Sequence, residues 1–353
     1  MKTAKLAAAV TGIVAIGALL LSGCSSQPST GGASQGPSAS GSPRPTVHLN
    51  VGYISTSING VGLTEVANHL DLWKQAGVDV NLIPFTDGPT QVQAMAAGSL
   101  DIGYVGGGAT WMAMTGQAVI VAPSEATLGD AIIASAKSGA KTIADLKGLR
   151  VGVAKGGSGE LILDLALQKA GLTPDDITEV PLTAPAVVTA FVAGQIDVAA
   201  TYSPLSDQIL QSAPDAVTIA TDKDFPDSQF IGAWVASTQA MSQHPDAVER
   251  FLEVYAQAND YRIANPTDSV NWASAASGAP ADQLQSQVNT LKWWPSSQIA
   301  QDNASGLTAQ RFTNLQNLFI SVGRMTQDQE KPIADWLNTD LYNQAEQTVQ
   351  ASK

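Results

Sequence analysis

The sequence of 353 residues has one cysteine, Cys24, and only three histidines, His48, His69 and His244. A single cysteine excludes an internal disulfide and a metal site built from several thiolates. The histidines stand in unrelated segments, so we expect no histidine-based metal site. Basic residues are also scarce: 18 Lys and Arg face 31 Asp and Glu, for a net charge of −13. This balance argues against nucleic-acid binding and against electrostatic docking on anionic lipid.

A membrane-spanning run is lacking as well. The apolar stretch from Leu6 to Leu20 is shorter than the ~20 residues that cross a bilayer, and it follows Lys2 and Lys5, as in a secretory signal. It ends in Leu21-Ser22-Gly23-Cys24, which resembles the lipobox of bacterial lipoproteins. In that family the signal is cut before the cysteine, which is then acylated, and two or more acyl chains anchor a protein stably. The sequence thus predicts a lipoprotein signal over residues 1–24 with lipidation at Cys24.

The segment 25–46 has no means of building a core, because 15 of its 22 residues are Ser, Gly or Pro. We interpret it as a flexible tether that holds the folded part at the extracytoplasmic face of a bacterial plasma membrane. The remaining residues suffice for two lobes with separate cores. We expect a monomer without a cofactor.

One phrase occurs twice in the chain. Ala94–Asp101 reads AMAAGSLD and Ala190–Asp197 reads AFVAGQID, and each is followed by an apolar residue. In both copies an apolar helical run stops at a glycine suited to a helix C-cap, and a strand follows. The copies lie too far apart for a solenoid, whose repeats are about 20–50 residues long. This pattern predicts one unit used once in each of two α/β lobes.

Strands alternate with helices along the chain, which predicts parallel sheets built from βαβ units. We assign residues 47–137 and 225–353 to the first lobe and residues 138–224 to the second, each a mostly parallel sheet flanked by helices. The clearest elements are a strand over 47–55, a helix over 63–75 and a long helix over 245–264. Two lobes leave a cleft between them, where small ligands bind.

Three turns place hydrogen-bond donors where a strand ends and a helix begins. A helix N-terminus has unpaired N–H groups and a partial positive charge, which together suit an anion. The turns supply as candidate ligand-binding residues Ser55, Thr56, Ser57, Asn59, Gly107, Gly108, Ala109, Gly157 and Ser158.

Four segments carry a resemblance to a known family: Lys141–Ala154, Gly98–Gly108, Gly194–Pro204 and the stretch 244–266. They resemble the substrate-binding proteins of ABC importers, in the branch that binds taurine, aliphatic sulfonates and nitrate. The resemblance implies a two-lobed periplasmic-binding-protein-like fold of type II. It also implies capture of a small anion or zwitterion, a sulfonate such as taurine or an alkanesulfonate, for delivery to an ABC permease and its ATPase. A nitrate- or bicarbonate-like anion and a thiamine pyrimidine precursor remain alternatives.

The resemblance also bears on single residues. Tyr202 matches an aromatic that covers the ligand, and Trp234 matches a second family aromatic. Taurine binders carry an acid two positions before that aromatic, where this chain has Gly232, so taurine itself is in doubt. Asp130 or Glu160 is then the candidate to face a cationic group, unless these are ordinary solvated or capping acids. Four tryptophans are expected to be packing anchors: Trp272, Trp293, Trp294 and Trp336.

A catalytic role finds little support. Gly156-Gly-Ser-Gly-Glu160 begins like the nucleophile elbow G-x-S-x-G, but Glu160 stands where the final glycine is required. No histidine lies in a context suited to activating Ser158. We therefore expect no enzyme and no catalytic residues, with a secreted hydrolase as a distant alternative.

Overall fold

The computed structural model describes residues 44–226 and 228–352. The expected signal, the lipidation at Cys24 and residues 25–43 of the expected tether lie outside these residues. None of the helices in the described ranges is long and apolar enough to cross a membrane.

Eleven strands in the described residues form two sheets. One has six strands in the order β11-β4-β10-β3-β1-β2, and the other has five in the order β7-β6-β8-β5-β9. The bounds are β1 Val47–Ile54, β2 Val78–Phe85, β3 Ile102–Val105, β4 Val119–Thr127, β5 Asp130–Ala134, β6 Arg150–Val153, β7 Thr178–Pro181, β8 Val198–Tyr202, β9 Val217–Thr221, β10 Phe230–Ala236 and β11 Leu291–Trp293. We call the part around the six-stranded sheet the first lobe and the part around the five-stranded sheet the second lobe.

The α/β fold class is confirmed, but both sheets are mixed where the sequence predicted mostly parallel ones. β1 runs parallel to β2 and β3, and β6 runs parallel to β7 and β8. In contrast, β10 is antiparallel to β3 and β4, and β5 is antiparallel to β8 and β9. The antiparallel strands β5 and β10 are those through which the chain enters one sheet from the other.

The chain crosses between the sheets twice, from β4 to β5 and from β9 to β10. β5 belongs to the second sheet, so the first crossing lies at residues 128–129, ahead of the boundary at 137 that the sequence suggested. The return lies between residues 221 and 230, close to the expected 225.

The repeated phrase forms the same structure in each lobe. Gly98 and Gly194 end their helices in the left-handed conformation, with φ of 73° and 69°. The Asp101 carboxylate accepts a hydrogen bond from the backbone N–H of Asn50 at 2.8 Å. The Asp197 carboxylate accepts the equivalent bond from the N–H of Arg150 at 3.0 Å. Each Asp therefore ties the strand after the glycine cap to the neighbouring strand, β1 or β6.

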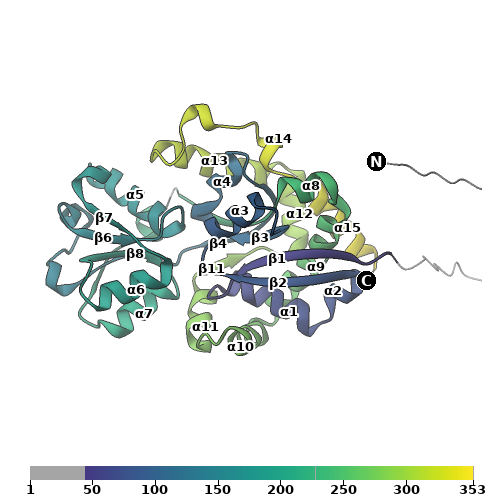
Figure 1. Cartoon of the computed structure of the whole chain (residues 1–353), viewed down its shortest axis with the longest axis horizontal. Helices are drawn as coiled ribbons and strands as arrows, with labels where there is room; N and C mark the ends of the chain where they lie inside the picture. The colour runs from purple at the N-terminus through teal and green to yellow at the C-terminus, as the bar shows by residue number, and fades with distance from the viewer. Residues whose placement is uncertain (1–43, 227, 353) are drawn as a thin grey trace, which may run out of the picture. The chain divides into compact units, whose positions relative to one another are not determined.

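Helices cover both faces of each sheet (Figure 1). In the second lobe α5 packs against β5 and β8, while α6 and α7 lie on the opposite face. In the first lobe α3 and α4 lie on one side of the sheet and α1 and α2 on the other. The bounds are α1 Leu63–His69, α2 Leu72–Gln75, α3 Gly88–Ala96, α4 Trp111–Met114, α5 Ser158–Ala170, α6 Ala184–Val192, α7 Leu205–Ser212, α8 Thr238–Gln243, α9 Pro245–Ala264, α10 Pro266–Ser277, α11 Ala281–Asn289, α12 Ser296–Ala304, α13 Leu307–Ser321, α14 Ile333–Trp336 and α15 Asp340–Ala351.

The expected helix over 63–75 is divided into α1 and α2, because Asp71 adopts a left-handed conformation with φ of 53°. The last residues of the expected tether are bound to the first lobe. The Arg44 guanidinium donates two hydrogen bonds of 2.7 Å to the Glu253 carboxylate on α9. Arg250 of the same helix donates to the carbonyl of Pro45 at 2.6 Å.

Candidate functional site

A cavity of about 70 Å³ lies between the two lobes. The first lobe contributes wall residues from β3, β4 and the turn after β3, and the second lobe contributes wall residues from β5, β8 and the start of α5. Pockets that enclose drug-sized ligands measure about 300–1,000 Å³, so this cavity suits a small solute.

The lobes touch each other beside the cavity. The turn η2 (Gly107–Ala109) follows β3 and meets the N-terminus of α5. A Cβ atom on Gly108 would lie 2.3 Å from the backbone N and Cα of Ser158 and 2.4 Å from the carbonyl carbon of Gly157. Backbone atoms cannot move aside as a flexible side chain can, so this contact requires glycine at position 108.

The N-terminus of α5 faces the cavity but is partly occupied. Gly157 and Ser158, the N-cap and first residue, line the cavity. The Glu160 carboxylate in the first turn accepts a hydrogen bond from the N–H of Gly156 at 2.5 Å. The same carboxylate forms ion pairs with Lys155 at 2.5 Å and Arg324 at 2.8 Å. Glu160 thus binds the N–H that precedes the N-cap of its own helix and lies outside the cavity wall, and its negative charge in the first turn offsets part of the helix dipole.

A chain of hydrogen bonds supports the first-lobe wall. Trp293 Nε1 donates to Asn59 Oδ1 at 2.6 Å, and Asn59 Nδ2 donates to the Tyr104 hydroxyl at 3.2 Å. The Tyr104 hydroxyl donates in turn to Glu125 Oε1 at 2.6 Å. Behind this chain the buried Arg262 guanidinium lies 4.6 Å from the centre of the Trp293 ring. Asn59, Tyr104 and Glu125 line the cavity, so the network holds three polar groups in place.

Glu125 owes its position to a glycine on the neighbouring strand. It lies opposite Gly232 in the antiparallel pairing of β4 and β10, where a Cβ on Gly232 would come within 2.0 Å of Glu125 Oε1. The Glu125 side chain is 1% exposed, and its Oε2 has no hydrogen-bond partner among the described residues. Burial raises the pKa of this carboxyl above its usual range.

Asp130 faces the same cavity from the second lobe. It is 1% exposed, and neither of its carboxylate oxygens has a hydrogen-bond partner in the described residues. Its backbone N–H donates to Asp222 Oδ2 at 2.7 Å, which joins the two segments that cross between the lobes. Burial raises the pKa of Asp130 to about 7, the charge of Glu125 adds to this rise, and the nearby Ser158 hydroxyl opposes it. Burial and the Asp130 charge raise the pKa of Asp222 to about 9.

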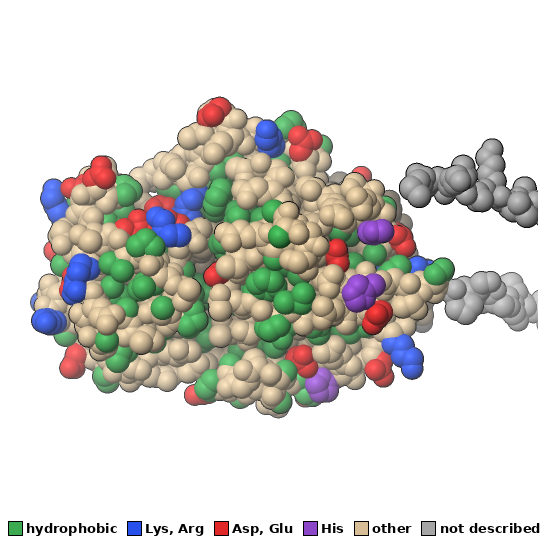
Figure 2. Space-filling view, viewed as in Figure 1, with side chains coloured by type: hydrophobic (Ala, Val, Ile, Leu, Met, Phe, Trp, Pro, Cys, Tyr) green, Lys and Arg blue, Asp and Glu red, His purple; other side chains and the backbone are tan. Residues whose placement is uncertain are grey.

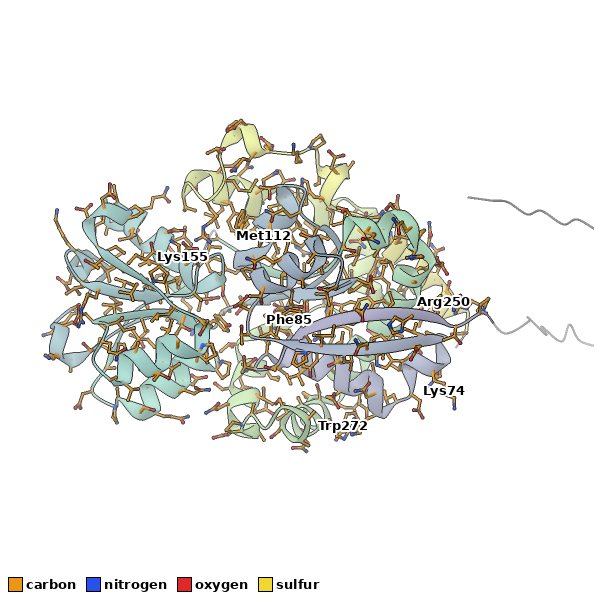
Figure 3. The ribbon with its side chains drawn as sticks, viewed as in Figure 1. Lys74, Phe85, Met112, Lys155, Arg250 and Trp272 are labelled. Atoms are coloured by element: carbon orange, nitrogen blue, oxygen red, sulfur yellow. The ribbon has the colours of Figure 1, made fainter. Side chains whose placement is uncertain are left out.

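The charged side chains of the wall are three acids, Asp87, Glu125 and Asp130, and one base, Lys155. Figure 3 shows Lys155 on the side of the second lobe that faces the first. Its ammonium group pairs with Glu160 at 2.5 Å and Glu179 at 2.6 Å, so its charge is already balanced. Asp87 caps α3 by accepting the N–H of Thr90 at 2.9 Å. Within residues 44–226 and 228–352, no group of three His, Cys, Asp or Glu is placed to hold a metal ion.

The structure brings together most of the residues that the sequence predicted. The cavity wall contains Ser57, Asn59, Gly107, Ala109, Asp130, Gly157, Ser158 and Tyr202. Five others lie outside it: Ser55, Thr56, Gly108, Glu160 and Trp234.

The residues outside the wall have structural contacts instead. The Ser55 hydroxyl donates to the carbonyl of Phe85, and the carbonyl of Thr56 accepts from Gln287 Nε2 at 2.9 Å. Trp234 is fully buried behind Tyr104, with 5.7 Å between their ring centres. These residues shape the wall without reaching the cavity.

Several wall residues were missed from the sequence. Glu125 and Tyr104 lie within apolar strands, and Gln287 reaches the wall from α11, far along the chain. A glutamate inside the buried strand β4 was a signal, since charged residues are almost never buried without a partner. Nothing local in the sequence marks Gln287.

Comparisons with known proteins agree with one another. The family model described as NMT1/THI5 like matches residues 63–269. A protein of Brucella abortus, named only for a binding role, is 35% identical over 280 residues, which cover 79% of this chain and 87% of that protein. The taurine-binding periplasmic protein of Escherichia coli is 26% identical over 61% of this chain and 69% of its own length. The alkanesulfonate-binding protein of Xanthomonas axonopodis, solved with bound MOPS, has a TM-score of 0.62 at 21% identity, covering 84% of this chain and all of that one. This last similarity concerns the fold.

Proposed function

The chain belongs to the NMT1/THI5-like family, and from that premise we propose that it is the lipid-anchored, solute-binding component of an ABC importer. It captures a small charged solute between its lobes at the extracytoplasmic face of the membrane. It then delivers the solute unchanged to a permease driven by an ATPase. The names of its sequence relatives, which include a taurine-binding protein and a protein named for binding aliphatic sulfonates, both of Escherichia coli, support this assignment.

The observation that carries the proposal is a cavity that neither lobe forms alone. Glu125 and Gly107 of the first lobe line it together with Asp130, Ser158 and Tyr202 of the second. A ligand that contacts both lobes stabilises the closed arrangement by the contacts that the open one lacks. Micromolar affinity requires about 8 kcal/mol net, which a few hydrogen bonds to charged groups at roughly 1.5–3 kcal/mol each can supply after the cost of binding.

The visible surface fits a protein that presents no single-sign docking patch. Figure 2 shows acidic and basic side chains scattered over this face of the molecule.

The test is recovery of the natural ligand. Full-length protein is purified from the envelope of its host, denatured, and the released small molecules are identified by mass spectrometry. We expect a small charged compound that rebinds and is recovered unaltered after incubation with fresh protein. Gly108→Val is the control, because a branched side chain against Ser158 keeps the lobes apart, and it is expected to carry far less of the compound. A chemically altered compound would overturn the transport role.

Anchoring is tested separately. Cys24→Ala is expected to release the protein from membranes without unfolding it, because Cys24 is the only thiol in the chain available for acylation. Membrane fractionation with mass spectrometry of the N-terminal peptide measures both effects. Parent protein that carries no acyl groups would refute the lipid anchor and leave solute binding intact.

A further inference from the structure

Two buried carboxylates face one cavity from opposite lobes. Glu125 lies on β4 of the first sheet and Asp130 on β5 of the second, and each is 1% exposed. Glu125 Oε2 and both carboxylate oxygens of Asp130 have no hydrogen-bond partner in the described part of the chain. The Ser124 and Ser158 hydroxyls lie close enough to lower the pKa values of Glu125 and Asp130, but neither forms a hydrogen bond to these oxygens in the described residues. Because burying a carboxylate without a partner is costly, a group from outside the chain would stabilise them.

Both side chains are held in this position. The Tyr104 hydroxyl binds Glu125 Oε1, and Gly232 leaves the space that the Glu125 carboxylate fills. The hydrogen bond from the Asp130 N–H to Asp222 fixes the backbone at Asp130. These contacts therefore fix the positions of both carboxylates in the wall of the cavity.

The wall does not balance these acids with a free cation. Lys155 is the only basic residue of the described wall, and Glu160 and Glu179 bind its ammonium group. Arg262 lies outside the wall, where it donates to Asn59 and Asn259 and stacks on Trp293. Its charge lowers the pKa of Glu125 but does not outweigh the effect of burial, which raises it. An anion without a compensating cation would meet these two acids in a site shielded from water, where each carboxylate in its ionised form repels a like charge strongly.

We propose that the ligand of this cavity carries a protonated nitrogen that binds between Glu125 and Asp130. The ligand is then an amine or a zwitterion, and a simple anion is excluded. This inference rests on the solute-binding role proposed above. In a zwitterion the negative end would lie toward the Ser158 hydroxyl and the N-terminus of α5, which carries a partial positive charge.

The placement of one carboxylate on each lobe also couples binding to closure. Without a ligand, the closed cavity disfavours the charge of both acids, because burial raises the pKa of each and the charge of Glu125 raises the pKa of Asp130 further. A protonated nitrogen between them makes charge-assisted hydrogen bonds to both lobes, so the same pair of acids then holds the lobes together.

The experiment measures thermal unfolding of the full-length protein, by tryptophan fluorescence, against a metabolite library of amines, zwitterions and simple anions. Each stabilising compound is paired with an analogue in which a hydroxyl replaces the amine, as isethionate does for taurine. We expect only the nitrogen-bearing members to stabilise the protein. Equal stabilisation by isethionate and taurine, or by ethanesulfonate or nitrate alone, would overturn the inference while leaving solute binding in place. A library in which no compound stabilises the protein would count against the solute-binding role itself, and the inference would fall with it.

Two amide variants test the residues. Asp130→Asn and Glu125→Gln keep the shape of the side chain and remove its charge. Each variant is expected to bind the stabilising compounds with roughly ten- to hundredfold lower affinity in calorimetric titration. Glu346→Gln, a buried acid on α15 outside the cavity wall, is the matched control and should leave affinity unchanged. If an amide variant does not fold, the smaller Asp130→Ser or Glu125→Ser replaces it. Unchanged affinity in the folded variants at both positions would refute the proposed contact.

Discussion

Replacing Gly108 by alanine is expected to block the closed arrangement of the lobes without weakening either lobe. The backbone at Gly108 lies outside the left-handed region, so alanine can adopt its conformation. The new Cβ, however, would lie 2.3 Å from the backbone of Ser158 in the other lobe. An open protein can accept the methyl group, whereas the closed one cannot.

The magnitude follows from the contact. An ordinary Cβ contact begins at 3.4 Å, so the lobes must separate by about 1 Å at this point. Overpacking costs typically about 1–3 kcal/mol, and the upper end applies because the clashing atoms are backbone. A loss of ~3 kcal/mol from the closed state lowers apparent affinity by roughly 100-fold, since binding requires that state.

The assay combines calorimetric titration of the ligand recovered from the native protein with small-angle X-ray scattering. Parent protein is expected to become more compact on ligand addition, and Gly108→Ala is expected to remain expanded. Gly106→Ala is the control for compaction in the scattering arm alone, because it lies in the same turn and its Cβ would have nothing within 4 Å, although the residue lines the cavity. If Gly108→Ala compacts and binds like the parent, the contact with Ser158 is not part of the ligand-bound state and the reasoning fails.

Three further predictions concern the walls of the cavity. Trp293→Ala removes the indole donor to the Asn59 network, and we expect urea denaturation to show a loss of about 3 kcal/mol in unfolding free energy, against no loss if the ring is peripheral. Folding raises the pKa of Asp130 to about 7 and that of Asp222 to about 9, so the folded state favours the protonated form of both acids. The stability that this contributes is complete below the unfolded pKa of about 3.9 and is lost as the pH rises through 7 and 9. Thermal unfolding from pH 5 to 9 should therefore show a decline that Asp130→Asn and Asp222→Asn flatten, and parallel curves for parent and variants would contradict this. Gly232→Ala should push the Glu125 carboxylate away from its hydroxyl partner and lower the unfolding free energy by about 1–3 kcal/mol, so an unchanged denaturation midpoint would show that the carboxylate relaxes freely.

The repeated units were predictable because their signals are local. A glycine with positive φ ends each helix, and the Asp three residues later binds the neighbouring strand. The turns at Asn59, Gly107 and Ser158 were predictable as turns for the same reason, since strand, turn and helix follow one another in sequence.

The sheet that receives β5 was not predictable from such signals. Residues 131–134 form an apolar run that fits the interior of either sheet, and only tertiary pairing with β8 and β9 places it in the second lobe. The same pairing brings Asp130 to the cavity and into the hydrogen bond with Asp222. The antiparallel pairing of β5 and β10 accompanies these crossings, which βαβ alternation alone does not reveal.

Glycine at position 232 illustrates why site chemistry is harder to transfer than fold. Compared position by position with taurine binders, Gly232 suggests that the acid for an amine is missing. In the folded chain the carboxylate of Glu125, on the adjacent strand, occupies the space next to Gly232, and any side chain at position 232 would collide with it. The small residue and the acid therefore belong together: the glycine makes room for a negative charge that arrives from another strand. Residues more than a hundred positions apart in sequence can lie side by side in an antiparallel pair. The charge of a cavity therefore has to be summed over all the residues of its wall, not compared position by position.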